Sequence, residues 1–163
     1  MSLGARVTNA GGFVGVISDT HGLVRPEAVA ALAGAELIIH AGDVGGPEVL
    51  EALGRLAPVV AVRGNNDRGA WADGLPEYET VEVNNTSIYV LHDLKELDIA
   101  PAAAGFRVVV AGHSHKPLIE ERRGVLYLNP GSAGPRRFKL PVTVARLKPD
   151  SGDASAEIIN LDV

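Results

Sequence analysis

The chain has 163 residues, of which 46% are hydrophobic, and its 15 Lys and Arg against 20 Asp and Glu give a formal net charge of −5. This length fits one well-buried core, and the hydrophobic content excludes disorder over most of the chain. The negative charge disfavours nucleic acid as a partner, because binding by phosphate neutralisation normally needs a basic surface. The sequence has no cysteine, which excludes disulfides and thiolate metal sites, so any bound metal needs oxygen and nitrogen ligands.

The N-terminal residues 1–12 are interpreted as a flexible leader, because Met1-Ser2-Leu3 is typical of an expression leader, and residues 13–163 as one domain. No apolar run approaches the roughly 18 residues of a membrane span, and the N-terminus lacks a signal-peptide pattern. We therefore expect no membrane partner and a cytoplasmic location. The sequence leaves a homo-oligomer open.

The first half of the chain alternates apolar runs with helical segments. The expected elements are strands at 14–17, 36–40 and 58–62 and helices at 26–33 and 47–56. A strand-helix-strand order implies crossover connections and a parallel sheet. The polar residues that follow these strands are therefore expected at one edge of that sheet.

The second half of the chain is richer in strands. The expected elements are a loop at 68–76, strands at 78–83 and 87–91 joined by a turn at Asn84-Asn85, and a helix at 95–104, which Pro101 either limits or divides by starting a second short helix. A strand at 107–111 and hairpin-linked strands at 118–122, 125–128, 143–147 and 156–161 follow. The predicted fold class is α/β with α+β character, a two-sheet β sandwich flanked by helices. One sheet is expected to be mixed and covered by helices, and the other to be built from the later strands.

The first strand ends in a carboxylate and an imidazole, Asp19 and His21. In an extended backbone, side chains two residues apart project to the same side, so these two groups are expected to converge. A carboxylate oxygen beside an imidazole nitrogen suits a divalent first-row metal ion.

Other strand ends carry the same kind of side chain. Asp43, Asn65 and His92 each follow an apolar run, as does the pair His113 and His115. Four of the five histidines in the chain fall at such ends. Burying several carboxylates and imidazoles together is costly without a metal, so the joint pattern predicts a metal site.

These residues occur in blocks whose order and spacing are those of a known family. The sequence resembles the calcineurin-like metallophosphoesterase superfamily in five blocks and, in a sixth, its small bacterial and archaeal phosphodiesterase branch. The blocks are Asp19-x-His21, Gly42-Asp43, Gly64-Asn65-x-Asp67, His92, Gly112-His113-x-His115 and Asn129-Pro130-Gly131-Ser132. The resemblance implies the family's four-layer architecture and a binuclear metal site.

The resemblance also implies a role for each matching residue. Asp19, His21 and His115 would hold one divalent ion; Asn65, His92 and His113 would hold the second; Asp43 would bridge both. Two such ions lower the pKa of a shared water, so that a bridging hydroxide attacks phosphorus in line. Manganese is the first expectation for the metals, with iron, zinc, nickel and cobalt as alternatives.

Asp43, Asn66 and Asp67 are the expected catalytic group. Many family members have a histidine at position 66, where it contacts the phosphate. Asn66 can donate a hydrogen bond but cannot act as a general acid, a loss that typically lowers rates by about 10²–10⁴. We therefore expect modest activity that favours diesters or activated esters over alkyl monoesters. Asp67 is expected to fix the loop at 64–66.

Several residues keep two interpretations. Arg136 and Arg137, with Asn66, are candidates for substrate contacts, and surface arginine is the alternative for both. His40 is expected to support the site from the core rather than to bind metal. Asp93 is expected to cap a helix rather than to accept a hydrogen bond from His92.

The leading functional hypothesis is a metal-dependent phosphodiesterase acting on a small phosphate ester or a nucleotide-like substrate. The alternative is a weakly catalytic or non-catalytic interaction scaffold, because the retromer subunit with this fold also lacks the histidine and mainly binds partners. The intact set of seven ligand positions favours catalysis. The sequence does not identify the substrate, the resident metals or the oligomeric state.

Overall fold

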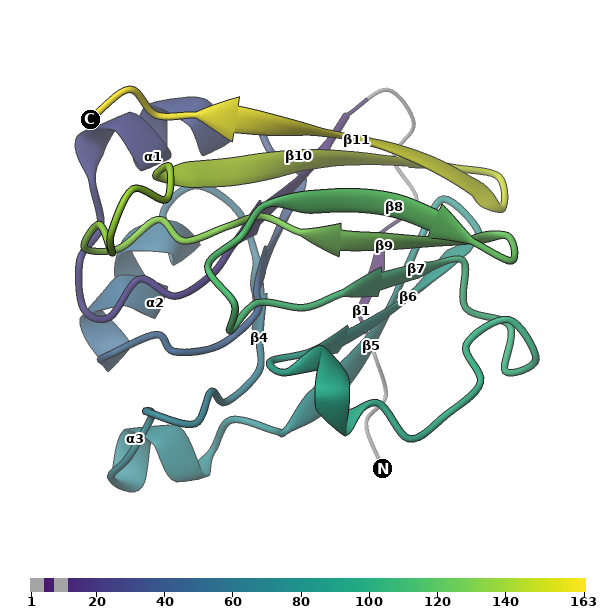
Figure 1. Ribbon diagram of the computed structural model, residues 1–163, viewed down its shortest axis with the longest axis horizontal. Helices are drawn as coiled ribbons and strands as arrows, with labels where there is room; N and C mark the ends of the chain where they lie inside the picture. Colours follow the sequence, from purple (N-terminus) through teal and green to yellow (C-terminus); the bar gives the residue numbers. More distant parts are fainter. Residues whose placement is uncertain (1–4, 8–11) are drawn as a thin grey trace.

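Two β-sheets packed face to face form the centre of the molecule (Figure 1). The structure is a computed structural model and describes residues 5–7 and 12–163. The strands of the first sheet lie in the order β11-β10-β2-β3-β4. Their bounds are β2 Val14–Ile17, β3 Leu37–His40, β4 Val59–Ala61, β10 Thr143–Asp150 and β11 Asp153–Asn160. The second sheet has the order β1-β5-β6-β7-β9-β8. Its strands are β1 Ala5–Val7, β5 Tyr78–Val83, β6 Thr86–Leu91, β7 Val108–Val110, β8 Leu118–Arg122 and β9 Val125–Asn129.

Both sheets are mixed. In the first, β2, β3 and β4 are parallel to one another, as the sequence predicts, and β10 is antiparallel to β2. In the second, β6, β7 and β9 are parallel. The carboxyl ends of parallel neighbours lie at one edge of a sheet, and this is the edge where open α/β sheets bind ligands.

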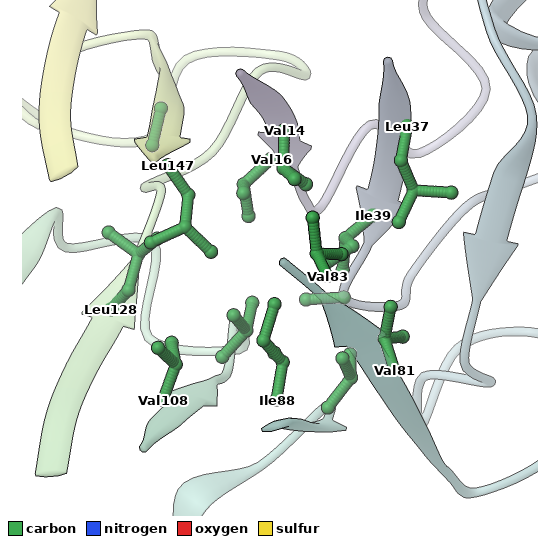
Figure 2. Packing of buried hydrophobic residues seen from close by; sticks show 14 of the residues in the cluster. Val14, Val16, Leu37, Ile39, Val81, Val83, Ile88, Val108, Leu128 and Leu147 are labelled. Atoms are coloured by element: carbon green, nitrogen blue, oxygen red, sulfur yellow. The ribbon is translucent and has the colours of Figure 1, made fainter. Parts of the chain in front are cut away.

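The core lies between the two sheets (Figure 2). Val14 and Val16 project into it from the first sheet, and Ile88 and Val108 from the second. These four side chains are completely shielded from solvent, and each contributes roughly 1.5–3 kcal/mol to stability by its burial. The alternation of core residues along β2 and β7 follows from the two-residue period of a strand.

Each sheet has a second face that other elements cover. Helices α1 (Pro26–Leu32) and α2 (Pro47–Gly54) pack on the first sheet and lie together on one flank of the molecule (Figure 1). On the second sheet, Tyr89 and Val109 pack against Leu94 and Phe106, in and after the 3₁₀ helix η1 (Leu94–Glu96). The predicted helix-flanked sandwich is thus confirmed, with a 3₁₀ helix and turns forming its fourth layer.

Two local predictions are wrong. The predicted helix at 95–104 is absent, and η1 with a series of turns takes its place. Pro101 lacks an amide hydrogen and disfavours helical backbone at Ala100, which explains why the helix does not form. The predicted loop at 68–76 contains a short helix, α3 (Ala70–Asp73), whose Trp71 packs against the core beneath α1 and α2.

The last hairpin lies in a different sheet from the one predicted. The β10–β11 hairpin pairs with β2 in the helix-flanked sheet, and only the β8–β9 hairpin joins the second sheet.

Within the segment interpreted as a leader, Ala5–Val7 forms β1, parallel to β5, while residues 1–4 and 8–11 lie outside the described residues. No helix in the described part of the chain has the length and apolarity to cross a membrane.

Candidate metal centre

Five of the seven predicted ligands have a left-handed backbone. The φ angles are 56° at Asp19, 47° at His21, 55° at Asp43, 72° at His113 and 63° at His115. This conformation is uncommon for residues other than glycine, and clusters of it mark functional sites. Asp19 and His21 therefore do not converge through an extended backbone, as the sequence analysis expects, but because a tight turn folds both inward.

The first group of side chains comes from the loops after β2 and β7. Asp19 Oδ1 lies 3.3 Å from His115 Nε2 and 4.0 Å from His21 Nε2. Asp19 is completely buried, and its other oxygen, Oδ2, accepts hydrogen bonds from Ser18 Oγ at 2.7 Å and from the amide of His113 at 3.1 Å. One carboxylate oxygen is thus held by the protein, while the other faces two imidazole nitrogens.

The second group of side chains comes from the loops after β3, β4, β6 and β7. His92 Nε2 lies 3.4 Å from Asp43 Oδ2, 3.0 Å from Asn65 Oδ1 and 3.3 Å from His113 Nδ1. Asp43 Oδ2 also lies 3.7 Å from His21 Nε2. The carboxylate of Asp43 therefore lies between the two groups, and Asp19 Oδ1 similarly lies 4.0 Å from His92 Nε2.

Acceptor atoms meet at this point, and no hydrogen lies between them when the His92 ring is neutral. The Nδ1 of His92 lies 2.7 Å from the Ala41 carbonyl oxygen, so Nδ1 carries the proton of a neutral ring and Nε2 presents a lone pair to the surrounding oxygens. Among the described residues, the buried atoms Asp19 Oδ1 and His21 Nε2 have no hydrogen-bond partner. A buried acceptor without a partner is costly, and a cation among these atoms would remove that cost.

The side chains of Asp19, His21, Asp43, Asn65, His92, His113 and His115 are called the cluster below. The electrostatics of the cluster favour positive charge. Burial disfavours protonated His92, but hydrogen bonding to Asp43 and the charge of Asp19 outweigh burial and raise the pKa of His92. Burial also works against an ionised Asp43, yet hydrogen bonds from His92 and Asn66 hold the pKa of its carboxyl well below the usual range. A proton on His92 thus supplies part of the charge that a metal ion would bring.

Two sets of side chains have the donor types and spacing to hold a metal ion. Within each set, the ligand atoms lie within 4.8 Å of one another. The sets are Asp19, His21 and His115, and Asp19, Asp43 and His92. Both sets contain Asp19, and their oxygen and nitrogen donors, together with the partnerless buried atoms, fit a divalent metal ion.

Asp67 fixes the loops that carry Asp43 and Asn65. Its buried carboxylate accepts hydrogen bonds from the amides of Val44 at 3.1 Å, Gly45 at 3.0 Å and Gly64 at 2.9 Å. These contacts agree with the expected role in fixing the loop at 64–66 and extend it to the loop after β3. Because the carboxylate is directed at backbone amides, Asp67 positions the site rather than contacting reacting atoms.

His40 supports the same loops from inside the core. Its Nδ1 accepts a hydrogen bond from the Gly42 amide at 3.1 Å, so Nε2 carries the proton and donates to Thr20 Oγ1 at 3.0 Å. Thr20 then donates to the Val44 carbonyl at 2.7 Å. Burial lowers the pKa of His40 to about 3, which keeps the ring neutral as this network requires. The sequence places His40 correctly in the core but gives no signal for its pairing with Thr20.

The segment Asn129-Pro130-Gly131-Ser132 braces two loops of the cluster. The Asn129 amide donates to the Gly112 carbonyl at 3.0 Å, next to His113. Ser132 Oγ donates to the Asp19 carbonyl at 3.1 Å. Asn129 and Ser132 thus hold these loops in position, a role that the motif did not specify.

The remaining candidates differ in how close they come to the cluster. Asn66 is directed at Asp43, donating from Nδ2 to Oδ2 at 3.0 Å and from its backbone amide to Oδ1 at 2.9 Å. Arg136 donates to the carbonyl oxygen of Val163, so its guanidinium is engaged at the C-terminus. Burial lowers the pKa of His115; the charge of Asp19 opposes this shift, and the positive charge of Arg137 adds to it.

Asp93 adopts the expected capping role. Its Oδ1 accepts a hydrogen bond from the Lys95 amide at 3.1 Å at the start of η1. The alternative partner, His92, is bound to Ala41 instead. The second oxygen of Asp93 lies 3.7 Å from His113 Nε2, an interaction that the sequence did not suggest.

Two cavities border the cluster. One has a volume of about 500 Å³ and is lined by charged and aromatic residues, including Arg63, Glu77 and Tyr78, together with Asn65 and His92. The other has a volume of about 740 Å³, and its lining is mostly apolar but includes His113. Both volumes are typical of small-molecule sites, and Asp93 lines both cavities.

Comparison with known proteins identifies the family. Residues 13–152 match the family model described as the calcineurin-like phosphoesterase superfamily domain. A probable metallophosphoesterase of Methanocaldococcus jannaschii is 41% identical over 132 residues, which are 73% of this chain and 67% of that protein. Another from Methanothermobacter thermautotrophicus is 37% identical over 158 residues, 90% of this chain and 91% of that protein.

Solved structures share the fold at lower sequence identity. An archaeal phosphodiesterase is 23% identical with a TM-score of 0.75, covering 90% of this chain and 99% of its own. Vps29 of Entamoeba histolytica, solved in complex with zinc, is 24% identical with a TM-score of 0.69, covering 92% of this chain and 99% of its own. At these identities the likeness is one of fold.

Proposed function

The chain belongs to the calcineurin-like phosphoesterase superfamily, and from that premise we propose that it is a phosphodiesterase dependent on two divalent metal ions. The observation that carries this proposal is the convergence of lone pairs at the strand ends. His92 Nε2 faces the oxygens of Asn65 at 3.0 Å and Asp43 at 3.4 Å, and Asp19 Oδ1 is buried without a hydrogen-bond partner among the described residues. Atoms arranged in this way repel one another unless positive charge lies among them.

In the proposed site, Asp19, His21 and His115 hold one ion, and Asn65, His92 and His113 hold the other. The spacing of Asp43 Oδ2, 3.7 Å from His21 and 3.4 Å from His92, supports its role as the bridge. Two bound ions would lower the pKa of a shared water and stabilise the attacking and leaving oxygens of a displacement at phosphorus. Manganese remains the first choice of metal.

The protein's own residues would set the geometry of this reaction. Asn66 holds the Asp43 carboxylate by two hydrogen bonds, which fixes the orientation of the proposed bridge. An amide at position 66 offers no titratable proton for a leaving alkoxide, so substrates with good leaving groups are favoured. Arg137, near His115, is proposed to add positive charge for the phosphate, whereas the engagement of Arg136 with Val163 argues against such a role for Arg136.

A diester fits the surroundings of the cluster better than a monoester. The charged cavity meets the cluster at Asn65 and His92, and the apolar cavity meets it at His113. The two ester groups of one phosphate could therefore occupy separate cavities. The proposed substrate class is a small phosphodiester or a nucleotide-like ester.

The test is hydrolysis of bis-p-nitrophenyl phosphate with Mn²⁺, before and after chelation, in the wild type and in Asp43→Asn. We expect chelation to abolish turnover and Asp43→Asn to lower it at least about 100-fold, because groups that merely support metal ligands already account for about 10–100-fold. The control is Asp73→Asn on α3, an exposed carboxylate outside the cluster, which should retain wild-type turnover. Turnover that persists unchanged in Asp43→Asn would rule the proposal out.

The scaffold alternative has one observation in its favour, the shared fold of Vps29. It predicts that the metal-loaded protein hydrolyses the diester only weakly or not at all. The same assay therefore distinguishes the two functions.

A further inference from the structure

The apolar cavity next to His113 lies between η1 and the start of β8. Its volume is about 740 Å³, and we call it the apolar groove. Its apolar lining includes Leu94, Val109, Ala111, Pro117, Leu118 and Tyr127. Val109 and Ala111 are almost completely buried and form its floor, whereas Leu118 is 38% exposed at its wall.

The groove borders the proposed metal centre. His113 lines it, and Nδ1 of this residue lies 3.2 Å from Asn65 Oδ1 within the cluster. Gly112 and Asn129 also line it, and the Asn129 side chain holds the loop that carries His113. The loop that carries His113 therefore belongs both to the wall of the groove and to the cluster.

The chemistry of the groove selects one kind of ester group. Lys95 and Lys116, which also belong to its lining, complement the charge of a phosphodiester anion. The cavity on the other side of Asp93 contains Arg63, Arg68 and Glu77 and suits a polar group instead. The walls of the groove suit an aryl ring, which gains binding energy by burying apolar surface.

We propose that the apolar groove binds an aryl-sized, apolar ester group of the substrate while the phosphate lies at the metal centre. The proposal rests on the proposed function and makes it more specific, because it assigns the substrate to diesters with at least one bulky apolar ester group. Leu118 is the residue in the wall of the groove whose exposed surface this ester group would cover.

The experiment compares two non-hydrolysable probes, phenylphosphonate and methylphosphonate, by calorimetric titration of the Zn²⁺-loaded protein. Both carry the same anionic head, so their affinity ratio isolates the contribution of the ring. We expect phenylphosphonate to bind the wild type about tenfold more tightly, the effect of partly burying an aromatic ring. Leu118→Asp should reduce the ratio to about twofold or less without weakening methylphosphonate, and Leu118→Ala should give an intermediate ratio.

The matched control is Ile119→Asp. Ile119 is the next residue on the same edge strand and is 41% exposed, but it points to the opposite face and does not line the groove. This variant should keep the tenfold preference. Equal affinity of the two probes for the wild type, or an unchanged preference in Leu118→Asp, would overturn the groove proposal alone. Failure of both probes to bind would overturn the proposed function with it.

Discussion

At the scale of single residues, the buried polar groups around the cluster hold its loops in place. Asp67 and His40 both lie in the interior and direct their side chains at backbone amides or at other buried groups. Neither side chain is directed at the point where the lone pairs meet. Each one satisfies donors that the tight turns would otherwise leave unpaired.

Replacing Asp67 by alanine should destabilise the protein strongly. The change leaves the amides of Val44, Gly45 and Gly64 without their acceptor, and each unsatisfied buried donor costs about 1–3 kcal/mol. We expect the free energy of unfolding, measured by urea denaturation, to fall by at least about 3 kcal/mol. Asp73→Ala, at an exposed position, is the control, and an equally small loss in both variants would contradict this assignment.

His40 should make stability depend on pH. Its pKa is about 3 in the folded protein, against 6.5 ordinarily, so the unfolded chain binds the proton that the folded protein excludes. Stability from this residue is therefore complete above about pH 6.5 and decreases as the pH falls towards 3. Between pH 7 and pH 5, its share of the loss should be about 2 kcal/mol.

The measurement for His40 is the free energy of unfolding at both pH values, with a chelator present, in the wild type and in His40→Asn. The variant should be less stable at pH 7, because the link to Thr20 is lost, but its stability should change less between the two values. An identical pH dependence in both proteins would show that His40 does not remain neutral on folding.

At the scale of elements, the loops at the ends of the parallel strands approach so closely that they require glycine. A Cβ on Gly64 would lie 2.1 Å from the Asp43 amide nitrogen, and one on Gly112 would lie 2.1 Å from Ser18 Oγ. Real atoms cannot occupy such positions without moving a neighbour. The glycines before Asn65 and His113 thus allow the loops to bring those side chains together.

Gly64→Ala should disrupt the centre. The added methyl group must push the loop after β4 away from Asp43, so we expect at least about tenfold lower diesterase activity and lower stability. Gly54→Ala is the matched control, because a Cβ there has open space within 4 Å and the position closes helix α2. The control should keep full activity and gain up to about 1 kcal/mol in urea denaturation, since alanine favours a helix. Wild-type activity in Gly64→Ala would show that the loop tolerates displacement.

At the scale of the whole molecule, the proposed metal centre would connect the two sheets. Asp19 and Asp43 follow strands of the first sheet, whereas His92 and His113 follow strands of the second. Ions held by all four would link the layers at one end of the sandwich. Binding that occurs only in the folded state stabilises it by mass action.

Metal removal should therefore lower the thermal stability of the whole domain. At a metal concentration about 100 times the dissociation constant, the gain is about 2.7 kcal/mol, which for a chain of this size corresponds to roughly 5–10 °C in Tm. Calorimetry with Mn²⁺ or with a chelator measures the difference, and Asp43→Asn should reduce it. A Tm that is independent of metal would contradict the binding site.

The sequence by itself determined the strand pattern, the order of the polar blocks and the family. These are local properties of the sequence: apolar and polar residues alternate along a strand, and Gly, Asp or His follows where an apolar run ends. The predicted bounds of β5 and β8 agree with the structure. It could not determine the sheet that the β10–β11 hairpin joins, because an alternating strand fits either layer. It was also wrong about the helix at 95–104, where the proline outweighed the helical pattern.

Only the tertiary structure decided how the cluster is held. The turns at Asp19 and His21 depend on left-handed backbone angles, which the composition does not specify. The hydrogen bonds of Asp67 to three backbone amides and of His40 to Thr20 mostly join residues that are distant in sequence. The same is true of the apolar groove, because its walls come from η1, β8 and β9, which become neighbours only when the chain folds.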